Sequence, residues 1–446
     1  MRVTFPMNSN LEIISQCEKR KIISALRAGV VGSARVESFT VGLKEHLKTI
    51  DSWILDKDGT LVIEGKYGTG KSHMNKLIME KALDSGYGVA YIQFGVNPPM
   101  HKPSRIFESV FLNLVFRNED HTIDIHEILK KYVKKNMLNS NFTDLIRENI
   151  FLRPLFSEIK KQIKNDDISQ TSDYWDKWNY IIGLNKKAPL DFYYKIPNPE
   201  FRTVMNIYFN ILCTFSLIAR ELGYRGIILV FDELEIHDSL LYEDWRRNAS
   251  DFIDGIFLVT RNMSELIIEN AIKNYPLNEY LEFSNAYRGE KTGLLYNGYY
   301  RPSHDLPVEK RIRYVPKSIR SETMDLGIKC ALSMVTDQGV AINDKARKFN
   351  CKRIQLTILK KNDCEQLIEN IIAIYTDIYS ENIDFIKKFE GIKQEFLEVV
   401  LENYEKFAKK NKDATRILIR IAIDALDLLR INPSYRLDYF RHNLRN

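Results

Sequence analysis

The sequence predicts an α/β fold with a parallel sheet, helical insertions and a C-terminal helical lid. Three observations lead to this prediction. A short apolar run, residues 61–63, leads into a glycine-rich loop and then into apolar residues at helical spacing. A second apolar run, residues 227–231, ends in Asp232-Glu233, as buried parallel strands do where their carboxyl ends emerge. From about residue 360 onward, the chain carries helical patterns only.

The region before the glycine-rich loop is expected to be mainly helical. Residues 11–27 carry apolar side chains at helical spacing and are followed by Gly29, which predicts an amphipathic helix. Residues 39–42 then form a short extended piece before a helix over 43–53. This piece either contacts the base of a bound nucleotide or only packs against the N-terminal helix.

The glycine-rich loop carries the strongest functional signal. It follows the pattern G-x-x-x-x-G-K-S, and its glycines permit turns that aim backbone N–H groups at phosphate oxygens. We expect the Lys71 ammonium to reach the β- and γ-phosphates of ATP and the Ser72 hydroxyl to bind Mg²⁺. The pattern predicts a P-loop NTPase; the alternative is an ordinary turn between a strand and a helix. The predicted binding segment comprises Gly65, Lys66, Tyr67, Gly68, Thr69, Gly70, Lys71, Ser72 and His73.

The acidic pair after the second apolar run is the second functional signal. We expect Asp232 to hold Mg²⁺, which completes the set of ligands that Ser72 begins. Glu233 is expected to polarise the water that attacks the γ-phosphate, and Lys71 and Glu233 are therefore the predicted catalytic residues. The alternative for Glu233 is an ordinary loop carboxylate or a partner for an arginine. Glu235 is a weaker candidate for the same role.

Three further residues are candidate sensors of the γ-phosphate. Residues 256–260 predict the next strand, and a polar side chain at its tip, Thr260 or Asn262, could contact the phosphate or the lytic water. Ordinary strand capping is the alternative. Arg416 lies in the first turn of a helix expected over 414–429, where a cation is unfavourable unless an anion is near. A surface ion pair is the alternative for Arg416.

Two stretches are too long for simple connections. Residues 97–220 show helical patterns but no clear strand, and their lysine-rich faces are either solvated or in contact with nucleic acid. Residues 264–350 contain aromatic and basic side chains interleaved at 296–301 and 310–314. Such a pattern suits single-stranded nucleic acid, an arginine offered to a neighbouring subunit, or an ordinary exposed loop.

These patterns divide the chain into seven segments. The predicted segments are 1–56, N-terminal helical; 57–96, first part of the P-loop core; 97–220, helical insertion; 221–263, core with the acidic strand; 264–350, second insertion; 351–359, last core strand; and 360–446, helical lid.

Composition restricts the classes of protein that the chain could represent. The 446 residues include 65 Lys and Arg against 59 Asp and Glu, a net charge of +6 that permits contact with nucleic acid without requiring it. The five cysteines form no C-x-x-C pair, and the histidines lack metal-ligand spacing. No signal peptide or long apolar run is apparent. We therefore expect a cytoplasmic protein with reduced thiols and no membrane contact.

Seven segments carry a resemblance to a known family: residues 22–29, 39–42, 65–73, 222–226, 231–235, 414–420 and 424–427. Together they resemble the ATP-binding proteins of BREX phage-defence systems, the BrxD-like family, which is similar to the Orc/Cdc6 branch of the AAA+ ATPases. The resemblance implies an AAA+/ASCE-type core, ATP and Mg²⁺, Glu233 as the water-activating residue, and partner defence proteins such as a helicase or a methyltransferase.

Two functional hypotheses follow. The first is an ATPase whose cycle changes its shape or assembly, as an ATP-dependent homo-oligomer for example, and acts on partner proteins or DNA. The second is a nucleotide-gated scaffold or switch with little or no hydrolysis. A nucleic-acid enzyme such as a nuclease is a weaker third hypothesis, because the sequence has no paired-carboxylate motif of that class. Several arginines, Arg246, Arg247, Arg261, Arg301, Arg347 and Arg353, are candidates for an arginine finger.

Overall fold

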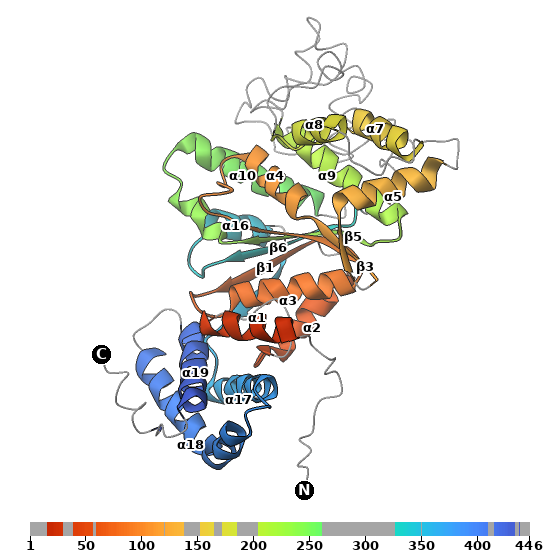
Figure 1. Ribbon diagram of the computed structural model, residues 1–446. Helices are drawn as coiled ribbons and strands as arrows, with labels where there is room; N and C mark the ends of the chain where they lie inside the picture. The colour runs from red at the N-terminus through yellow and green to blue at the C-terminus, as the bar shows by residue number, and fades with distance from the viewer. Residues whose placement is uncertain are drawn as a thin grey trace, which may run out of the picture. The chain divides into compact units, whose positions relative to one another are not determined.

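A computed structural model shows a mixed α/β protein, which confirms the predicted class (Figure 1). It divides into two compact units, one formed by residues 1–49, 65–77 and 355–446 and the other by residues 50–64 and 78–354. The residues that the structure describes are 16–29, 39–56, 59–119, 121–137, 152–164, 172–184, 204–260, 326–348, 350–408, 414–432 and 437.

A seven-stranded sheet, in the order β4-β3-β2-β5-β6-β1-β7, organises the fold. Strands β2, β5, β6 and β1 are mutually parallel, whereas β3 and β4 form an antiparallel hairpin beside β2. All seven residues of β5 and of β6 are buried, as expected for central parallel strands covered on both faces. The strands are β1 (Thr60–Gly65), β2 (Tyr87–Gln93), β3 (Val115–Asn118), β4 (His121–Asp124), β5 (Gly226–Asp232), β6 (Ile328–Met334) and β7 (Lys352–Leu356).

Helices α4, α9 and α10 pack over one face of this sheet (Figure 1). Helix α4 begins with a proline, which is favourable in a first turn, and buries Ile106, Phe107, Val110 and Phe111 at helical spacing. A second helical layer packs against α9 and contains α5, α7 and α8. The helices of this unit are α4 (Pro103–Asn113), α5 (Ile125–Met137), α7 (Arg153–Lys164), α8 (Ser172–Ile181), α9 (Val204–Glu221), α10 (Glu243–Val259) and α16 (Val340–Lys348).

Helices from the two ends of the chain form the core of the other unit. Helix α1 (Gln16–Arg27) packs with α17 (Lys361–Ile378), α18 (Ile383–Ala408) and α19 (Ala414–Ile431). Their shared apolar core includes Ile22, Ile23 and Leu26 of α1. The Arg27 guanidinium donates to both carboxylate oxygens of Asp427, at 2.7 and 2.9 Å, so the first and last described helices are joined by an ion pair as well as by apolar contacts.

Two elements differ from the sequence predictions in the region after the acidic strand. The strand expected over 256–260 is wrong, because these residues end helix α10, whose Phe252, Ile253, Ile256 and Phe257 are buried at helical spacing. A short apolar run does not distinguish a buried strand from one turn of a buried helix. The next strand of the sheet is β6, which lies inside the stretch assigned to the second insertion.

A third difference concerns the region 97–220, in which no strand was expected. Strands β3 and β4 form a hairpin there, joined near Glu119, which adopts a positive φ of 52°. Each strand has only four residues, too few for a clear alternation of apolar and polar side chains. The strands expected before the glycine-rich loop, before the acidic pair and within residues 351–359 are confirmed as β1, β5 and β7, and the helix expected over 414–429 is confirmed as α19 (Ala414–Ile431).

Among the described helices, no segment combines the length and the apolar character that crossing a bilayer requires.

Candidate functional site

The glycine-rich loop joins β1 to α3 (Lys71–Asp84). Gly68 and Gly70 have φ values of 75° and 95°, a backbone conformation that side chains with a Cβ rarely adopt. Gly65 is required for a different reason, because a Cβ there would lie 2.4 Å from the Thr69 hydroxyl oxygen. The loop therefore takes the close turns that a backbone phosphate cradle needs.

The Lys71 side chain lies within this loop. Its ammonium donates hydrogen bonds to the carbonyl oxygens of Gly65 at 2.9 Å and Lys66 at 3.3 Å, and it lies 5.3 Å from the centre of the Tyr67 ring. The side chain is largely buried, so its charge is held at the loop by carbonyl groups. A bound phosphate would offer stronger, charge-assisted acceptors to the same ammonium.

The turn that precedes the loop in sequence is hydrogen-bonded to it. Thr40 Oγ1 lies 2.9 Å from Nε2 of His73, in the first turn of α3. Burial, aided by the charge of Lys76, lowers the pKa of His73 to about 4, so the ring is neutral near pH 7. Next to Thr40, Gly42 has a φ of 68° and packs against the Asp363 carboxylate at the start of α17. Residues 39–42 thus contact both the loop and the lid helices.

Asp232 ends β5 and is almost completely buried, with 1% of its surface exposed. Both of its oxygens accept hydrogen bonds: Oδ2 from the Tyr91 hydroxyl at 3.0 Å and Oδ1 from the backbone N–H of Glu233 at 3.0 Å. Burial, together with the Asp232 charge, raises the pKa of Tyr91, so the hydroxyl keeps its proton and acts as a donor. The carboxylate is therefore fixed in orientation.

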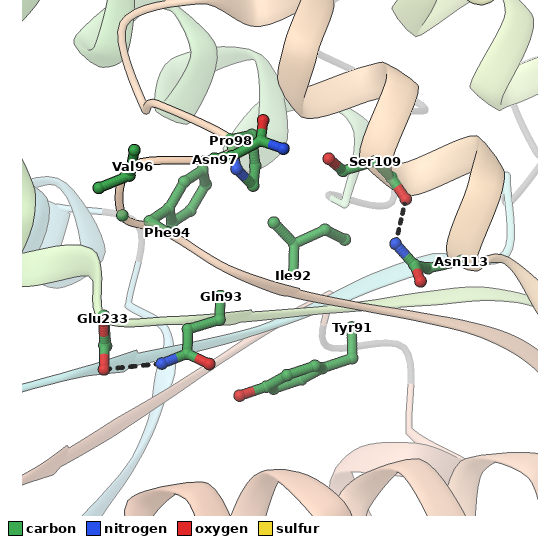
Figure 2. Close-up of a pocket in the computed structure, with 11 residues that line it drawn as sticks. Tyr91, Ile92, Gln93, Phe94, Val96, Asn97, Pro98, Ser109, Asn113 and Glu233 are labelled. Atoms are coloured by element: carbon green, nitrogen blue, oxygen red, sulfur yellow. Dashed lines mark hydrogen bonds between the residues drawn. The ribbon is translucent and has the colours of Figure 1, made fainter.

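Glu233 follows Asp232 in a left-handed backbone conformation, with φ 61° and ψ 40°. Such a conformation is uncommon for a residue other than glycine and is often found at functional sites. Its side chain accepts a 2.9 Å hydrogen bond from the amide of Gln93, the last residue of β2 (Figure 2). Gln93 and Asp232 are register partners in the parallel pair β2–β5, which explains why the two side chains meet.

A cleft of about 590 Å³ opens beside Glu233 (Figure 2). Its walls come from the end of β2, the loop after it and one side of α4. Among the described residues of the wall, Glu233 is the only charged one. The residues that line the cleft are Tyr91, Ile92, Gln93, Phe94, Gly95, Val96, Asn97, Pro98, Ser109, Asn113 and Glu233.

The segment after the acidic pair is fixed to the loop that follows β6. Residues Leu234–Ser239 form a short 3₁₀ helix. Within it, Glu235 accepts a hydrogen bond from the backbone N–H of Val335, and Asp238 accepts one from that of Gly339. The carboxyl end of β6 therefore lies beside the acidic pair. Sequence reasoning missed this position, because Lys329 and Ser333 interrupt the apolar pattern of residues 328–334.

Thr260 lies far from where the prediction placed it. It caps the C-terminal end of α10, and its hydroxyl lies 2.7 Å from that of Thr60 at the amino end of β1. The glycine-rich loop follows the opposite, carboxyl end of the same strand. The placement contradicts the basis for Thr260 as a γ-phosphate sensor, which was its position at the tip of a strand.

The other predicted sensors and arginines have varied positions. The exposed Arg416 packs its stem against Gly29 at the end of α1, and Asn262 lies outside the described residues. Arg353 is bonded to Glu64 and Asn343. Among the remaining arginine-finger candidates, Arg246 donates to backbone carbonyls, and Arg247 and Arg347 form ion pairs with aspartates of their own helices. Arg261, Arg301 and the runs 296–301 and 310–314 lie outside the described residues.

One family model matches the N-terminal part of the chain. Residues 14–164 of the 446 match the family model described as BREX system ATP-binding protein BrxC/D. The match spans α1, the glycine-rich loop and β2, and it confirms the resemblance to this family and supports ATP as a ligand. The acidic pair and helices α17 to α19 lie outside the matched residues. No curated protein matches the chain.

Proposed function

We propose that this chain, with its match to the BREX ATP-binding family, is a P-loop ATPase of the AAA+ type that works in anti-phage defence. It binds ATP and Mg²⁺ on the segment Gly65–His73 and hydrolyses ATP with the help of the acidic pair. The nucleotide cycle then acts on partner proteins, such as a helicase or a methyltransferase of the same system, or on DNA, through a homo-oligomer that assembles with ATP.

One observation carries the proposal. Strands β1 and β5 are both parallel to β6, the strand between them. The carboxyl ends of β1 and β5 therefore lie at the same edge of the sheet, which is where ligands bind in open parallel sheets. The glycine-rich loop continues directly from β1, and the acidic pair ends β5. The two motifs were predicted independently, and this strand order supports the proposal that they act together.

The residues present fit Mg²⁺. The ion prefers oxygen ligands and keeps several waters, so it needs only one or two protein groups besides the phosphates. The Ser72 hydroxyl and the Asp232 carboxylate supply these groups in the proposal. When bound, Mg²⁺ neutralises charge on the phosphates. No cluster of three or more metal-binding side chains occurs among the described residues, and this proposed site does not require one.

The protein groups have separate roles in hydrolysis. Loop N–H groups and the Lys71 ammonium stabilise charge on the β- and γ-phosphates. The Glu233 carboxylate accepts a hydrogen bond from the attacking water and takes its proton. Arg416 remains the arginine that we predict to reach the γ-phosphate from the lid. At the sensor position, the loop after β6 replaces Thr260, and Thr336 and Gln338 are its uncharged polar residues nearest the strand end.

One observation favours the nucleotide-gated scaffold as a second function. The Gln93 amide holds the Glu233 carboxylate through a hydrogen bond, and a base engaged in this way is less available to water. A chain in which this bond persists with ATP bound would hydrolyse slowly and act as a switch.

Steady-state hydrolysis and ATP affinity, measured on the full chain, test the proposal. We expect wild type to turn over, Glu233→Gln to bind ATP but stall, and Lys71→Ala to lose ATP binding. Glu235→Gln is the matched control, because Glu235 is acidic, close in sequence and bonded to the backbone of Val335. Turnover that survives Glu233→Gln would contradict the assigned base. Binding without turnover in wild type, at any protein concentration and with DNA added, would identify the scaffold.

A further inference from the structure

We infer that Tyr91 is a positioning residue for the metal-binding carboxylate of Asp232. The inference rests on the proposed function, in which Asp232 is a ligand of Mg²⁺. It extends that function to strand β2, which carries neither the glycine-rich loop nor the acidic pair. Tyr91 would act through Asp232, without touching the nucleotide or the metal.

Strand β2 supplies one hydrogen-bond donor to each acidic residue. Tyr91 and Gln93 are two positions apart on the strand, so their side chains share one face. The Tyr91 hydroxyl donates to Asp232, and the Gln93 amide donates to Glu233. Both residues are among the described residues that line the cleft beside Glu233 (Figure 2). The neighbouring strand thus holds the two carboxylates separately.

The Tyr91 hydrogen bond sets which carboxylate lone pairs a metal can use. A carboxylate at the end of a strand can rotate about its last torsion, which is broad and roughly two-fold. In Asp232 the two oxygens are bonded to different donors, the Tyr91 hydroxyl of β2 and the backbone N–H of Glu233, so rotation would break both bonds. Hydrogen bonds to metal-ligating carboxylates orient the ligand, and their loss typically weakens metal binding 10- to 100-fold.

A second tyrosine on the same strand provides a matched control. Tyr87, at the amino end of β2, donates its hydroxyl to the carbonyl oxygen of Ile54 at 3.3 Å. Replacing either tyrosine by phenylalanine removes one hydroxyl and one hydrogen bond from β2. Only Tyr91 is bonded to a proposed metal ligand, so a specific role predicts different results for the two variants.

The test measures metal affinity directly, with Mn²⁺ as a paramagnetic substitute for Mg²⁺. The full chain is saturated with ATP, and bound and free Mn²⁺ are separated by electron paramagnetic resonance. We expect Tyr91→Phe to raise the Mn²⁺ dissociation constant about tenfold, with ATP affinity in EDTA unchanged. Tyr87→Phe should match wild type within about twofold, and Asp232→Asn should lose most of the Mn²⁺ binding.

Each other outcome has a definite meaning. A Tyr91→Phe protein with wild-type Mn²⁺ affinity overturns the inference, and so does equal weakening in both phenylalanine variants, which would indicate general loosening of β2. If Asp232→Asn binds Mn²⁺ as wild type does, the inference fails while ATP binding stands. If wild type binds no ATP, the proposed function fails and the inference fails with it.

Discussion

The ion pair between Arg27 and Asp427 is expected to stabilise the packing of α1 against α19. Asp427 also accepts a hydrogen bond from the Tyr375 hydroxyl at 2.6 Å, and Arg430 donates to the same tyrosine. The substitution Asp427→Asn keeps the shape of the side chain and a possible bond to Tyr375, but it removes the charge that faces Arg27 and Arg430. We expect it to destabilise the unit formed by α1, α17, α18 and α19.

The expected loss of stability depends on how far the two side chains are exposed to solvent. The Asp427 side chain is 17% exposed and Arg27 is 42% exposed. A hydrogen bond to a charged group contributes about 1.5–3 kcal/mol when both partners are shielded, and solvent at Arg27 reduces this value. We therefore expect a loss of about 2 kcal/mol for Asp427→Asn and about 1 kcal/mol for Arg27→Met. The double variant should lose less than the sum, because the two changes remove one shared interaction.

Hydrogen exchange read by mass spectrometry is the suitable assay. A loss of about 2 kcal/mol in local opening free energy should speed exchange in peptides of α1 and α19 by about 30-fold. All four tryptophans belong to the unit that contains the sheet, so their fluorescence gives an independent control, which should not change. Equal acceleration of exchange in the strands, or unchanged exchange in α19, would refute the reasoning.

The ion pair between Arg27 and Asp427 also makes the free energy of unfolding depend on pH. Burial tends to raise the pKa of Asp427, but hydrogen bonds from Arg27 and Tyr375 and the nearby positive charges outweigh it and hold the pKa below its usual value of 3.8. The unfolded chain therefore binds more protons at low pH, and the stabilisation is lost as pH falls through 3.8 toward the folded-state pKa. The difference between wild type and Asp427→Asn should be constant from pH 5 to 7 and shrink below about pH 4.

Three further predictions concern single side chains. The buried Lys329 donates to two carbonyl groups at the end of helix α2 (Lys44–Leu55), so Lys329→Met should cost about 2 kcal/mol in urea unfolding followed by tryptophan fluorescence. Thr40→Val leaves His73 without its hydrogen bond and should weaken ATP binding about fivefold in a titration with labelled ATP; unchanged affinity would mean that residues 39–42 do not help to shape the loop. Gln93→Ala releases Glu233 and should raise the basal hydrolysis rate up to about fivefold, and a fall in rate would instead assign Gln93 to positioning the base.

The elements predicted well are those in which local chemistry and tertiary packing agree. The run from Leu61 to Ser72 combines a buried strand, obligatory glycines and a helix start within twelve residues, and the structure keeps all three. The run from Gly226 to Asp232 is apolar throughout because both faces of β5 are covered. In each case the local sequence is compatible with only one secondary structure.

Prediction failed where a residue's neighbours are distant in sequence. The apolar run of residues 256–259 suits a buried strand as well as a buried helix, and only its packing as the last turn of α10 decides between the two. Strand β6 carries a lysine at its second position, which interrupts the apolar pattern, yet Lys329 is buried because it caps α2. The tethers from Tyr91 and Gln93 depend on the β2–β5 register, which a sequence without its fold does not contain.

The pairing of α1 with α19 has a consequence for synthesis of the chain. Arg27 and Asp427 are separated by 400 positions, so ribosomes moving at about 5–20 residues per second make the second partner about 20–80 s after the first. During that interval the apolar face of α1, with Ile22, Ile23 and Leu26, has no native surface to cover it, because α17 to α19 do not yet exist. A nascent chain that stops before α19 leaves this face exposed, and the unit can close only after α19 has been synthesised.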